Sequence, residues 1–188
     1  MLQRTLIVIL FINLLIFLAI IGVRNALSKE DSIGKSPINR FLFIITKISF
    51  LVPWAFAFAG ALKPELLPEY FSNSMAWVAI ILIIIGFVIE IAGYVSLGIY
   101  TRFGLPTSES RLITSGIFKY CRHPMYLGLF IMIIGTTIYF PHWIAITCCV
   151  ITIILHHKVA LAEEKYMANI FSNDWEEYKK GSKMYLLW

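Results

Sequence analysis

The sequence predicts an all-α, polytopic integral membrane protein with five transmembrane helices. Of its 188 residues, 59% are hydrophobic and only 14% are charged, which is far from the balance of a soluble domain. The apolar residues are also gathered into long runs, and about 20 residues of α-helix match the thickness of a bilayer core. We therefore expect residues 1–188 to form one membrane domain, with three spans in residues 1–98 and a hairpin of two spans in residues 99–188.

Three apolar runs are each long enough for one crossing, and a fourth is long enough for two. The single crossings are Thr5–Val23, Phe41–Leu62 and Met75–Gly98. The fourth run, Met125–His157, is interrupted at Pro141. Because proline lacks a backbone N–H and disfavours helix in the residue before it, this run is expected to form two short helices in a tight hairpin.

The positions of lysine and arginine predict the orientation of the spans, because positively charged loops stay cytoplasmic. The side that carries the N-terminus has few basic residues, Arg4 and Lys63. The other side carries many: Arg24, Lys29, Lys35, Arg40, Arg102, Arg111, Lys119, Arg122, Lys158, Lys165, Lys179, Lys180 and Lys183. The N-terminus is therefore expected outside, and the C-terminal segment in the cytoplasm.

The remaining composition argues against several classes of site. The net charge of +5 follows from the orientation of the spans and suits anionic lipid headgroups, so no nucleic-acid partner is expected. Three cysteines, Cys121, Cys148 and Cys149, give no disulfide framework. The last two precede His156 and His157, but adjacent side chains diverge on a helix, so no metal site is expected.

A basic segment, CRHPMYLG at residues 121–128, stands directly before the hairpin. Proline prefers the first helical position, so Pro124 is expected to begin the fourth span. His123 precedes this proline and is expected in an extended conformation. Arg122 and His123 then lie beside the unpaired N–H groups of a helix start, where a carboxylate or a phosphate is favoured.

The hairpin is expected to return the chain to the face that it left. Two helices of about 16 residues each rise roughly 25 Å, which brings Glu163 and Glu164 near Arg122 and Tyr126. Close approach of the two helices is expected through small residues at helical spacing. These are Gly128, Gly135 and Thr136 on one helix and Ala145, Cys149 and Thr152 on the other.

The segments on either side of the hairpin are expected to lie at the membrane surface. The loop over residues 99–121 ends in an amphiphilic stretch. After Glu164 the chain is expected to be helical, with an apolar stripe that includes Trp175 and Tyr178 at three- and four-residue steps. The sequence SND at Ser172–Asp174 is able to break that helix and to cap a new one.

Two of these segments together resemble a known enzyme family. RLITSGIFKYCRHPMYLG, at residues 111–128, is followed after the hairpin by AEEKYMANIFSNDWEEYKK, at residues 162–180. The combination is similar to the C-terminal half of the isoprenylcysteine carboxyl methyltransferase and phospholipid methyltransferase superfamily, over roughly residues 97–180. The resemblance implies a membrane enzyme that binds S-adenosyl-L-methionine with this loop and both motifs, and that admits a lipophilic acceptor through a tunnel in the membrane.

The resemblance also implies site residues at the matching positions. Arg122 and Glu163 are the expected catalytic residues. The resemblance implies cofactor binding by Ser110, Arg111, Leu112, Ile113, Phe118, His123, Pro124, Met125, Tyr126, Glu163 and Glu164.

Methyl transfer of this type needs mainly in-line approach and desolvation, because the methyl donor is already activated. A carboxylate or thiolate acceptor favours a cation nearby, for which Arg122 and Lys158 are candidates. An amine acceptor favours a base instead, for which Glu163, Glu164 and His123 are candidates.

Two positions differ from the pattern of the carboxyl methyltransferases. These enzymes place an arginine four residues before the cofactor glutamate, where this chain has Val159. The neighbouring Lys158 points about 100° away on a helix. Phe118 stands where the family often has tyrosine. These differences argue against a prenylcysteine carboxylate as the acceptor.

Glu90 lies deep in the third expected span, where an ionisable group is unfavourable and is therefore a functional candidate. Two interpretations are open. Glu90 is either a substrate residue that lines an acceptor tunnel between spans three and four, or a structural residue. As a structural residue, it is a buried partner of Lys47 in span two or a neutral acid hydrogen-bonded within the bundle.

The sequence therefore predicts a multi-pass membrane methyltransferase that uses S-adenosyl-L-methionine at its cytoplasmic face on a lipophilic small molecule or lipid. A phospholipid N-methyltransferase and a thiol S-methyltransferase are alternatives. More distant alternatives are a non-catalytic membrane protein and an enzyme like the membrane sterol reductases. The latter carry a similar arginine-histidine-proline segment and use NADPH, but they normally have more than five spans.

Overall fold

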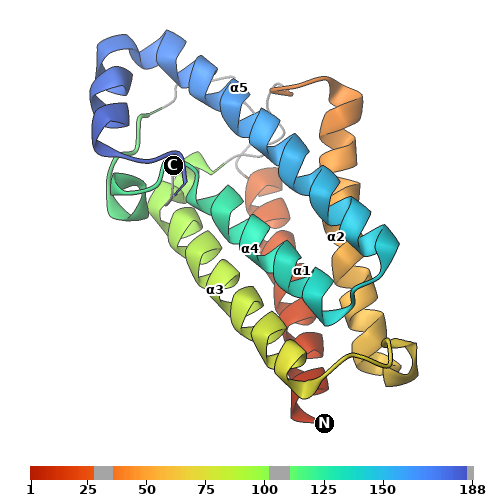
Figure 1. Cartoon of the computed structure of the whole chain (residues 1–188). Helices are drawn as coiled ribbons and strands as arrows, with labels where there is room; N and C mark the ends of the chain where they lie inside the picture. The colour runs from red at the N-terminus through yellow and green to blue at the C-terminus, as the bar shows by residue number, and fades with distance from the viewer. Residues whose placement is uncertain (28–35, 102–110, 186–188) are drawn as a thin grey trace.

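The computed structural model describes residues 1–27, 36–101 and 111–185, and five α-helices account for most of them (Figure 1). The helices are α1 (Leu2–Leu27), α2 (Arg40–Leu62), α3 (Asn73–Leu97), α4 (Pro124–Tyr139) and α5 (Trp143–Gly181). Short 3-10 helices lie between them: η1 (Pro64–Leu66), η2 (Gly98–Tyr100) and η3 (Gly116–Lys119). The prediction of an all-α fold is confirmed.

Four of these helices, α1, α2, α3 and α5, are long and apolar enough to cross a membrane by length and composition. Helix α4 is apolar but has only 16 residues, a rise of roughly 24 Å. Large apolar side chains are exposed on the outside of the bundle, including Ile81, Val88, Val95 and Ile154. Lipid contact explains such a surface. The chain thus has the helices of a multi-pass membrane protein, and the orientation of its termini stays a prediction.

The predicted hairpin is present, but its second arm is longer than expected. Helix α4 ends at Tyr139 and α5 begins at Trp143, so the turn contains Pro141 as predicted. The second arm is not the short helix that was expected, because the apolar part and the helix expected after Glu164 form one element, α5, which continues to Gly181 over 39 residues. Good helix formers, mainly alanine, glutamate and lysine, follow the apolar part and extend the helix.

Helix α5 changes direction at Ser172. The backbone there has φ 43° and ψ −109°, which is not a helical conformation. This residue belongs to the segment Ser172–Asp174 that was predicted to break the helix. Beyond the kink, the end of α5 turns back toward η3 and the start of α4 (Figure 1).

Helix α4 packs against α3 through glycines. A Cβ at Gly128 would lie 2.6 Å from the carbonyl oxygen of Gly86, and one at Gly135 would lie 2.9 Å from that of Ala79. The prediction that Gly128 and Gly135 face α5 is therefore wrong. Small residues at helical spacing mark a close contact, but they do not identify the partner helix.

Helix α5 packs mainly against α2. The Thr152 hydroxyl donates a hydrogen bond to the Ser49 hydroxyl at 2.8 Å, and both side chains are buried. Thr152 thus serves the contact with α2 rather than the predicted contact with α4, whereas Cys149 interacts with Thr137 of α4. The helices thus form two closely packed pairs, α3 with α4 and α2 with α5. Helix α4 also contacts α2 and α5, but less extensively than it contacts α3.

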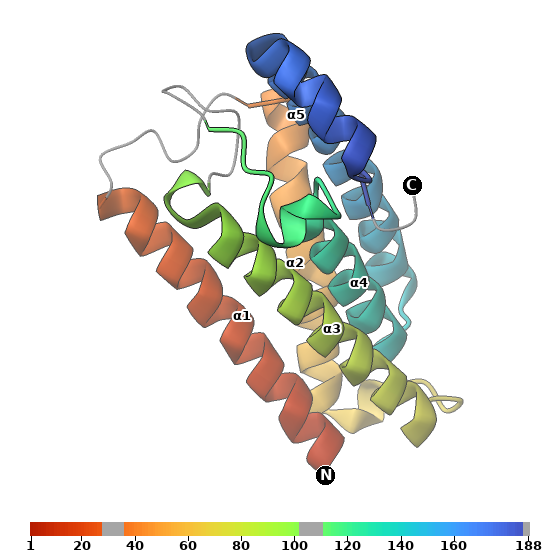
Figure 2. The same cartoon turned by 90° about the vertical axis from the view of Figure 1, so that its left-hand side faces the viewer.

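The apolar core lies where α2, α3 and α4 meet. Trp54, Ile83 and Met132 are fully buried there. Helix α1 adds Ile7 and Leu14 to this core, and α3 lies between α1 and α4 (Figure 2). One end of the bundle is therefore closed by apolar packing. The polar residues of the two sequence motifs gather at the other end.

Candidate active site

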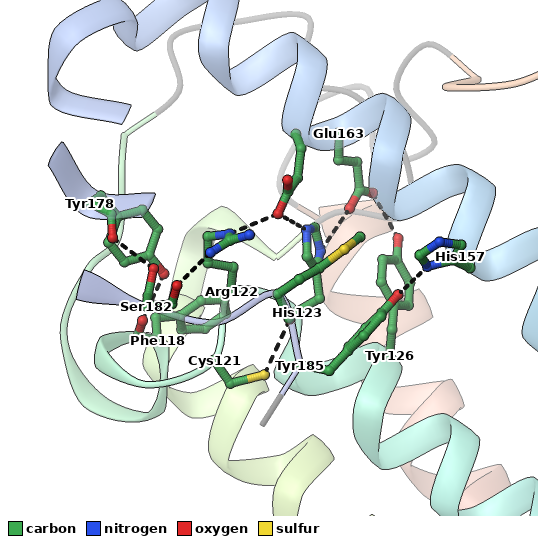
Figure 3. Close-up of polar contacts among 12 residues, drawn as sticks. Phe118, Cys121, Arg122, His123, Tyr126, His157, Glu163, Tyr178, Ser182 and Tyr185 are labelled. Atoms are coloured by element: carbon green, nitrogen blue, oxygen red, sulfur yellow. Dashed lines mark hydrogen bonds and ion pairs between the residues drawn. The ribbon is translucent and has the colours of Figure 1, made fainter. Parts of the chain in front are cut away.

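The hairpin brings the basic segment and the acidic pair together, as the sequence predicts. The Arg122 guanidinium donates from Nε to Glu164 Oε1 at 2.7 Å. The Tyr126 hydroxyl donates to Glu163 Oε1, also at 2.7 Å (Figure 3). Segments about forty residues apart in the chain thus form one polar cluster between the start of α4 and the middle of α5.

Two features of the local chain position Arg122. Pro124 occupies the first turn of α4, as predicted, and the preceding His123 has φ −127° and ψ 57°, outside the helical region. Arg122 also donates from Nη1 to the Ser182 carbonyl oxygen at 2.6 Å. The side chains of Arg122 and Glu164 are only 8% and 13% exposed, so each charge depends on the other for compensation.

His123 lies between the two glutamates without a close hydrogen bond to either. Its Nδ1 is 3.6 Å from Glu163 Oε2, and its Nε2 is 3.5 Å from Glu164 Oε1. Among the residues that the structure describes, Nε2 is buried and has no hydrogen-bond partner. The ring stacks on Tyr126 with centroids 5.7 Å apart. A buried ring nitrogen without a partner marks a position where a ligand is able to contribute the missing group.

The C-terminal segment forms one wall of the site, which sequence reasoning missed. Its backbone runs parallel to residues 121–123, with a bridge between Cys121 and Lys183. The Arg122 N–H donates to the Lys183 carbonyl oxygen at 2.8 Å, and the His123 N–H donates to that of Met184 at 3.2 Å. Backbone hydrogen bonds of this kind leave no side-chain signal in the sequence.

Tyr185 is the aromatic residue of this segment. Its hydroxyl is 3.1 Å from His157 Nδ1, and its ring contacts Phe130 edge to face. Burial raises the pKa of Tyr185, and the carboxylates of Glu163 and Glu164 raise it further. The hydroxyl therefore stays protonated at neutral pH. Figure 3 shows it directed at His157.

A cavity of about 250 Å³ opens between these elements. Most of the side chains predicted to bind the cofactor line it, and so does the predicted substrate residue Glu90. These predicted residues are Arg111, Leu112, Ile113, Phe118, Arg122, His123, Pro124, Met125, Tyr126 and Glu163. Glu164 contacts the cluster through Arg122. Lys158 is exposed and does not line the cavity, and Ser110 lies outside the described residues.

Other lining residues were not predicted as part of the site. Lys47 and His156 line the inner part of the cavity. From the sequence, Lys47 was considered only as an ion-pair partner of Glu90, and His156 only as a metal ligand. The rest are apolar or aromatic: Leu97, Tyr100, Leu129, Tyr166, Met167, Trp175 and Tyr178. Tyr166 and Met167 follow Glu163 by three and four residues, so helical spacing from the glutamate was a signal able to find them.

The kink at Ser172 positions the aromatic wall. It turns Trp175 and Tyr178 toward the loop, where the Tyr178 hydroxyl donates to the Phe118 carbonyl oxygen at 2.7 Å. The two aromatic rings contact each other edge to face, with centroids 5.6 Å apart. The cavity is therefore lined by aromatic side chains, by the basic residues Lys47, Arg111 and Arg122, and by the carboxyl groups of Glu90 and Glu163. Within the described residues, no group of three or more histidine, cysteine or acidic side chains is placed to hold a metal ion.

Comparison with known proteins identifies the family of this chain. Residues 74–174 match the phospholipid methyltransferase family. This match covers more than half of the chain and includes the first motif and the start of the second, with Glu163 and Glu164. The chain belongs to the phospholipid methyltransferase family. The predicted superfamily, which joins this family with the isoprenylcysteine carboxyl methyltransferases, is thereby confirmed.

Two curated relatives of this methyltransferase family member are protein-S-isoprenylcysteine O-methyltransferases. The chain is 31% identical to the one from Schizosaccharomyces pombe over 71 residues, which are 37% of this chain and 30% of that protein. It is 26% identical to the one from Dictyostelium discoideum over 160 residues, which are 82% of this chain and 62% of that protein. The chain thus spans less than two thirds of the length of each relative.

Proposed function

We propose that this chain is a membrane methyltransferase that transfers a methyl group from S-adenosyl-L-methionine to a lipophilic acceptor. The observation that carries the proposal is the cavity between the start of α4 and the middle of α5. It is lined by residues of both sequence motifs. The first motif and the double glutamate of the second lie inside the segment that matches the phospholipid methyltransferase family.

The residues of the cavity fit the charges of this cofactor, which carries a carboxylate, an ammonium and a sulfonium. Glu163 lines the cavity and offers a carboxylate to an ammonium group. Arg111 lines it as a cation for a carboxylate. The first backbone N–H groups of α4, at Met125 and Tyr126, favour an anion for the same reason as any helix start. His123, with its unpartnered Nε2, supplies a further polar contact.

The remaining polar residues hold this arrangement in place. Tyr126 donates to Glu163 and thereby fixes the carboxylate at the cavity wall. Arg122 joins Glu164 of α5 to the Ser182 carbonyl oxygen, so it positions three segments around the cofactor. Trp175 and Tyr178 add aromatic walls to the cavity. Electrostatic contacts inside such a site become stronger as less water is admitted.

The chemistry requires little from the protein beyond binding and alignment. When bound, S-adenosyl-L-methionine supplies an activated methyl group, whose bond to sulfur breaks with the electron pair kept by sulfur while the acceptor forms the new bond with its own lone pair. The protein has to hold the acceptor in line and free of water, which accounts for a large part of such rate enhancements. Arg122 and Glu163 remain the proposed catalytic residues, because both line the cavity.

The proposed orientation puts the cavity on the cytoplasmic side. It lies at the end of the bundle where α1 and α3 end and where α2 and α4 begin. Most basic residues of the described chain lie at this end, among them Arg24, Arg40, Lys119 and Arg122, and positively charged segments stay cytoplasmic. This orientation leaves the N-terminus outside.

Labelled methyl transfer tests the proposed function. The purified protein is supplied with methyl-labelled S-adenosyl-L-methionine and with extracts of host lipids and thiols, and label is followed into the organic phase. We expect label to appear with the wild-type protein and to fall on the order of a hundredfold or more with Glu163→Gln, since one charge-assisted contact to the cofactor is lost. Lys158→Gln, on the exposed side of α5, is the matched control.

The outcomes separate the proposal from its rivals. Persistent labelling with Glu163→Gln removes this residue from the site. An NADPH-dependent enzyme is indicated if NADPH stabilises the protein against heat while S-adenosylhomocysteine does not. If neither ligand stabilises the protein and no label is transferred, the chain is not an enzyme of this kind.

A further inference from the structure

The inner end of the cavity carries a second group of polar residues, separate from the cofactor motifs. Lys47 of α2, Glu90 of α3 and His156 of α5 all line the cavity. Neither family motif contains any of them. They come from three helices and face the same space, so their presence together needs its own explanation.

These three residues lie at a common depth. Lys47 is seven residues after the start of α2, Glu90 is seven residues before the end of α3, and His156 is seven residues before Glu163. Seven residues of helix rise roughly 10 Å. On α5, His156 therefore lies roughly 10 Å farther into the bundle than Glu163. Its ring still contacts that of Tyr126, with centroids 5.7 Å apart, so the group lies next to the polar cluster on its inner side.

Glu90 is the member that calls for a ligand. Its residue is only 9% exposed, and its Oε2 has no hydrogen-bond partner among the described residues. An unsatisfied carboxylate oxygen inside a membrane bundle is costly and marks a functional position. The terminal torsion of a glutamate is soft, so rotation of the carboxylate presents either oxygen to the cavity.

The backbone holds Glu90 firmly at this position. A Cβ at Gly128 would lie 2.9 Å from the Glu90 backbone nitrogen and 3.1 Å from its Cβ. Helix α3 therefore contacts α4 directly at Glu90, with no side chain between them. This close contact fixes the side chain at the cavity wall.

The chemistry of the group selects among acceptors. Lys47 interacts electrostatically with both Glu163 and Glu90, so its ammonium group faces two carboxyl groups and is not reserved for an anionic ligand. The Nδ1 of His156 lies 2.9 Å from the Thr152 carbonyl oxygen. Because a carbonyl only accepts, Nδ1 carries the proton, and the neutral ring leaves Nε2 as an acceptor. The inner end thus offers acceptor groups to a ligand.

We propose that Glu90 recognises the head group of the methyl acceptor, which is a hydrogen-bond donor, an amine or a hydroxyl on a lipophilic body, and not a carboxylate. This inference rests on the proposed function. The Glu90 carboxylate oxygen without a partner among the described residues accepts a hydrogen bond from the N–H or O–H of the acceptor. The nearby Lys47 ammonium group partly compensates the negative charge of Glu90. Val159 of α5 is apolar and buried, so this position offers no cation to bind a carboxylate on the acceptor.

Three probes that share a dodecyl chain test the inference: dodecylamine, 1-dodecanol and dodecanoic acid. Binding of each is measured on the wild-type protein in lipid nanodiscs saturated with S-adenosylhomocysteine. We expect the amine or the alcohol to bind on the order of tenfold or more tightly than the acid. The comparison of amine with alcohol identifies the donor group.

Variants assign the preference to Glu90. Glu90→Gln is expected to remove the preference for the donor probes and to leave the affinity for S-adenosylhomocysteine within about twofold, because Glu90 is not among the residues proposed to contact the cofactor. Glu65→Gln, at an exposed glutamate of η1, is the matched control and should keep the preference. The double variant Lys47→Gln/Glu90→Gln removes both charges together and repeats the test if the single variant does not fold.

Several results would overturn the inference while leaving the proposed function intact. These are tighter binding of the acid, an unchanged preference in Glu90→Gln, and binding of none of the three probes to a protein that binds S-adenosylhomocysteine. Loss of S-adenosylhomocysteine binding in both Glu90 variants would make Glu90 a structural residue. Failure of the wild-type protein to bind S-adenosylhomocysteine contradicts the proposed function itself.

Discussion

The two faces of α4 differ in how they meet their neighbours. Toward α3, glycine backbones approach so closely that a Cβ at Gly86 would lie 2.5 Å from the Gly128 carbonyl oxygen. Toward α5, polar side chains and a cavity fill the space between the helices. Lipid gives no hydrophobic force between helices, so the close contact with α3 is what holds α4. Because α4 is held by its packing against α3, its opposite face is able to line a cavity without losing its position.

The largest effect on stability is expected from removing the ion pair between Arg122 at the start of α4 and Glu164 of α5. Arg122→Ala leaves the buried Glu164 carboxylate without its cation, and such losses cost about 3 kcal/mol or more. The expected fall in the thermal midpoint in detergent is roughly 6–12 °C. The double variant Arg122→Met/Glu164→Leu, which removes both charges, should lose clearly less. Equal losses in the single and double variants would show that the ion pair is not what stabilises this side.

The next largest effect is expected from the closed side. Gly128→Ala introduces a Cβ against the backbone of α3, and overpacking of this kind costs about 1–3 kcal/mol. Gly22→Ala in α1 is the matched control, because a Cβ there meets nothing within 4 Å. Thermal unfolding of both variants measures the difference. A Gly128→Ala protein as stable as Gly22→Ala would contradict the close packing of α3 and α4.

A smaller effect is expected where α5 packs on α2. Thr152→Val removes the buried hydrogen bond to Ser49 but keeps the shape of the side chain, and such a loss costs about 1 kcal/mol. The thermal midpoint should fall by roughly 2–4 °C. Ser49→Ala/Thr152→Val removes both partners and should recover part of the loss. If the single variant unfolds like wild type, this hydrogen bond does not contribute to the contact.

The smallest effect is a change in the labelling rate of the Cys121 thiol, which lies next to Arg122 in the chain. Burial raises the pKa of Cys121, while the backbone of His123 and the charge of Arg122 lower it only in part. Less thiolate is therefore present at neutral pH, and maleimide should react with Cys121 more slowly than with a free thiol. The rate should rise as the pH rises toward the raised pKa. Rapid labelling of Cys121 at pH 7, read by mass spectrometry, would contradict its burial against the C-terminal segment.

Elements that depend on local patterns could be predicted from the sequence. The apolar runs gave the helices, and the turn at Pro141 and the start of α4 at Pro124 follow from the missing N–H of proline. The charged residues Arg122, Glu163 and Glu164 were placed together because a hairpin of known rise returns the chain to one face.

Elements that depend on long-range choice could not be predicted in this way. Gly128 and Gly135 fit either neighbour, and only the packing of the whole bundle selects α3. The C-terminal wall depends on backbone hydrogen bonds of Lys183 and Met184, which any residue types are able to make. Apolar lining residues such as Leu129 resemble the many apolar residues that face lipid.

The most direct test of the central claim is the stabilisation of the purified protein by S-adenosylhomocysteine. The claim is that the polar cluster between α4 and α5 is a cofactor site. All variants are compared at one ligand concentration, about 100 times the dissociation constant of the wild-type protein. At that concentration, the ligand should add about 2.7 kcal/mol to the free energy of unfolding of the wild-type protein. We predict this gain for the wild-type protein and for Lys158→Gln, and a small fraction of it for Glu163→Gln. An equal gain in Glu163→Gln, or no gain in the wild-type protein, would contradict the claim.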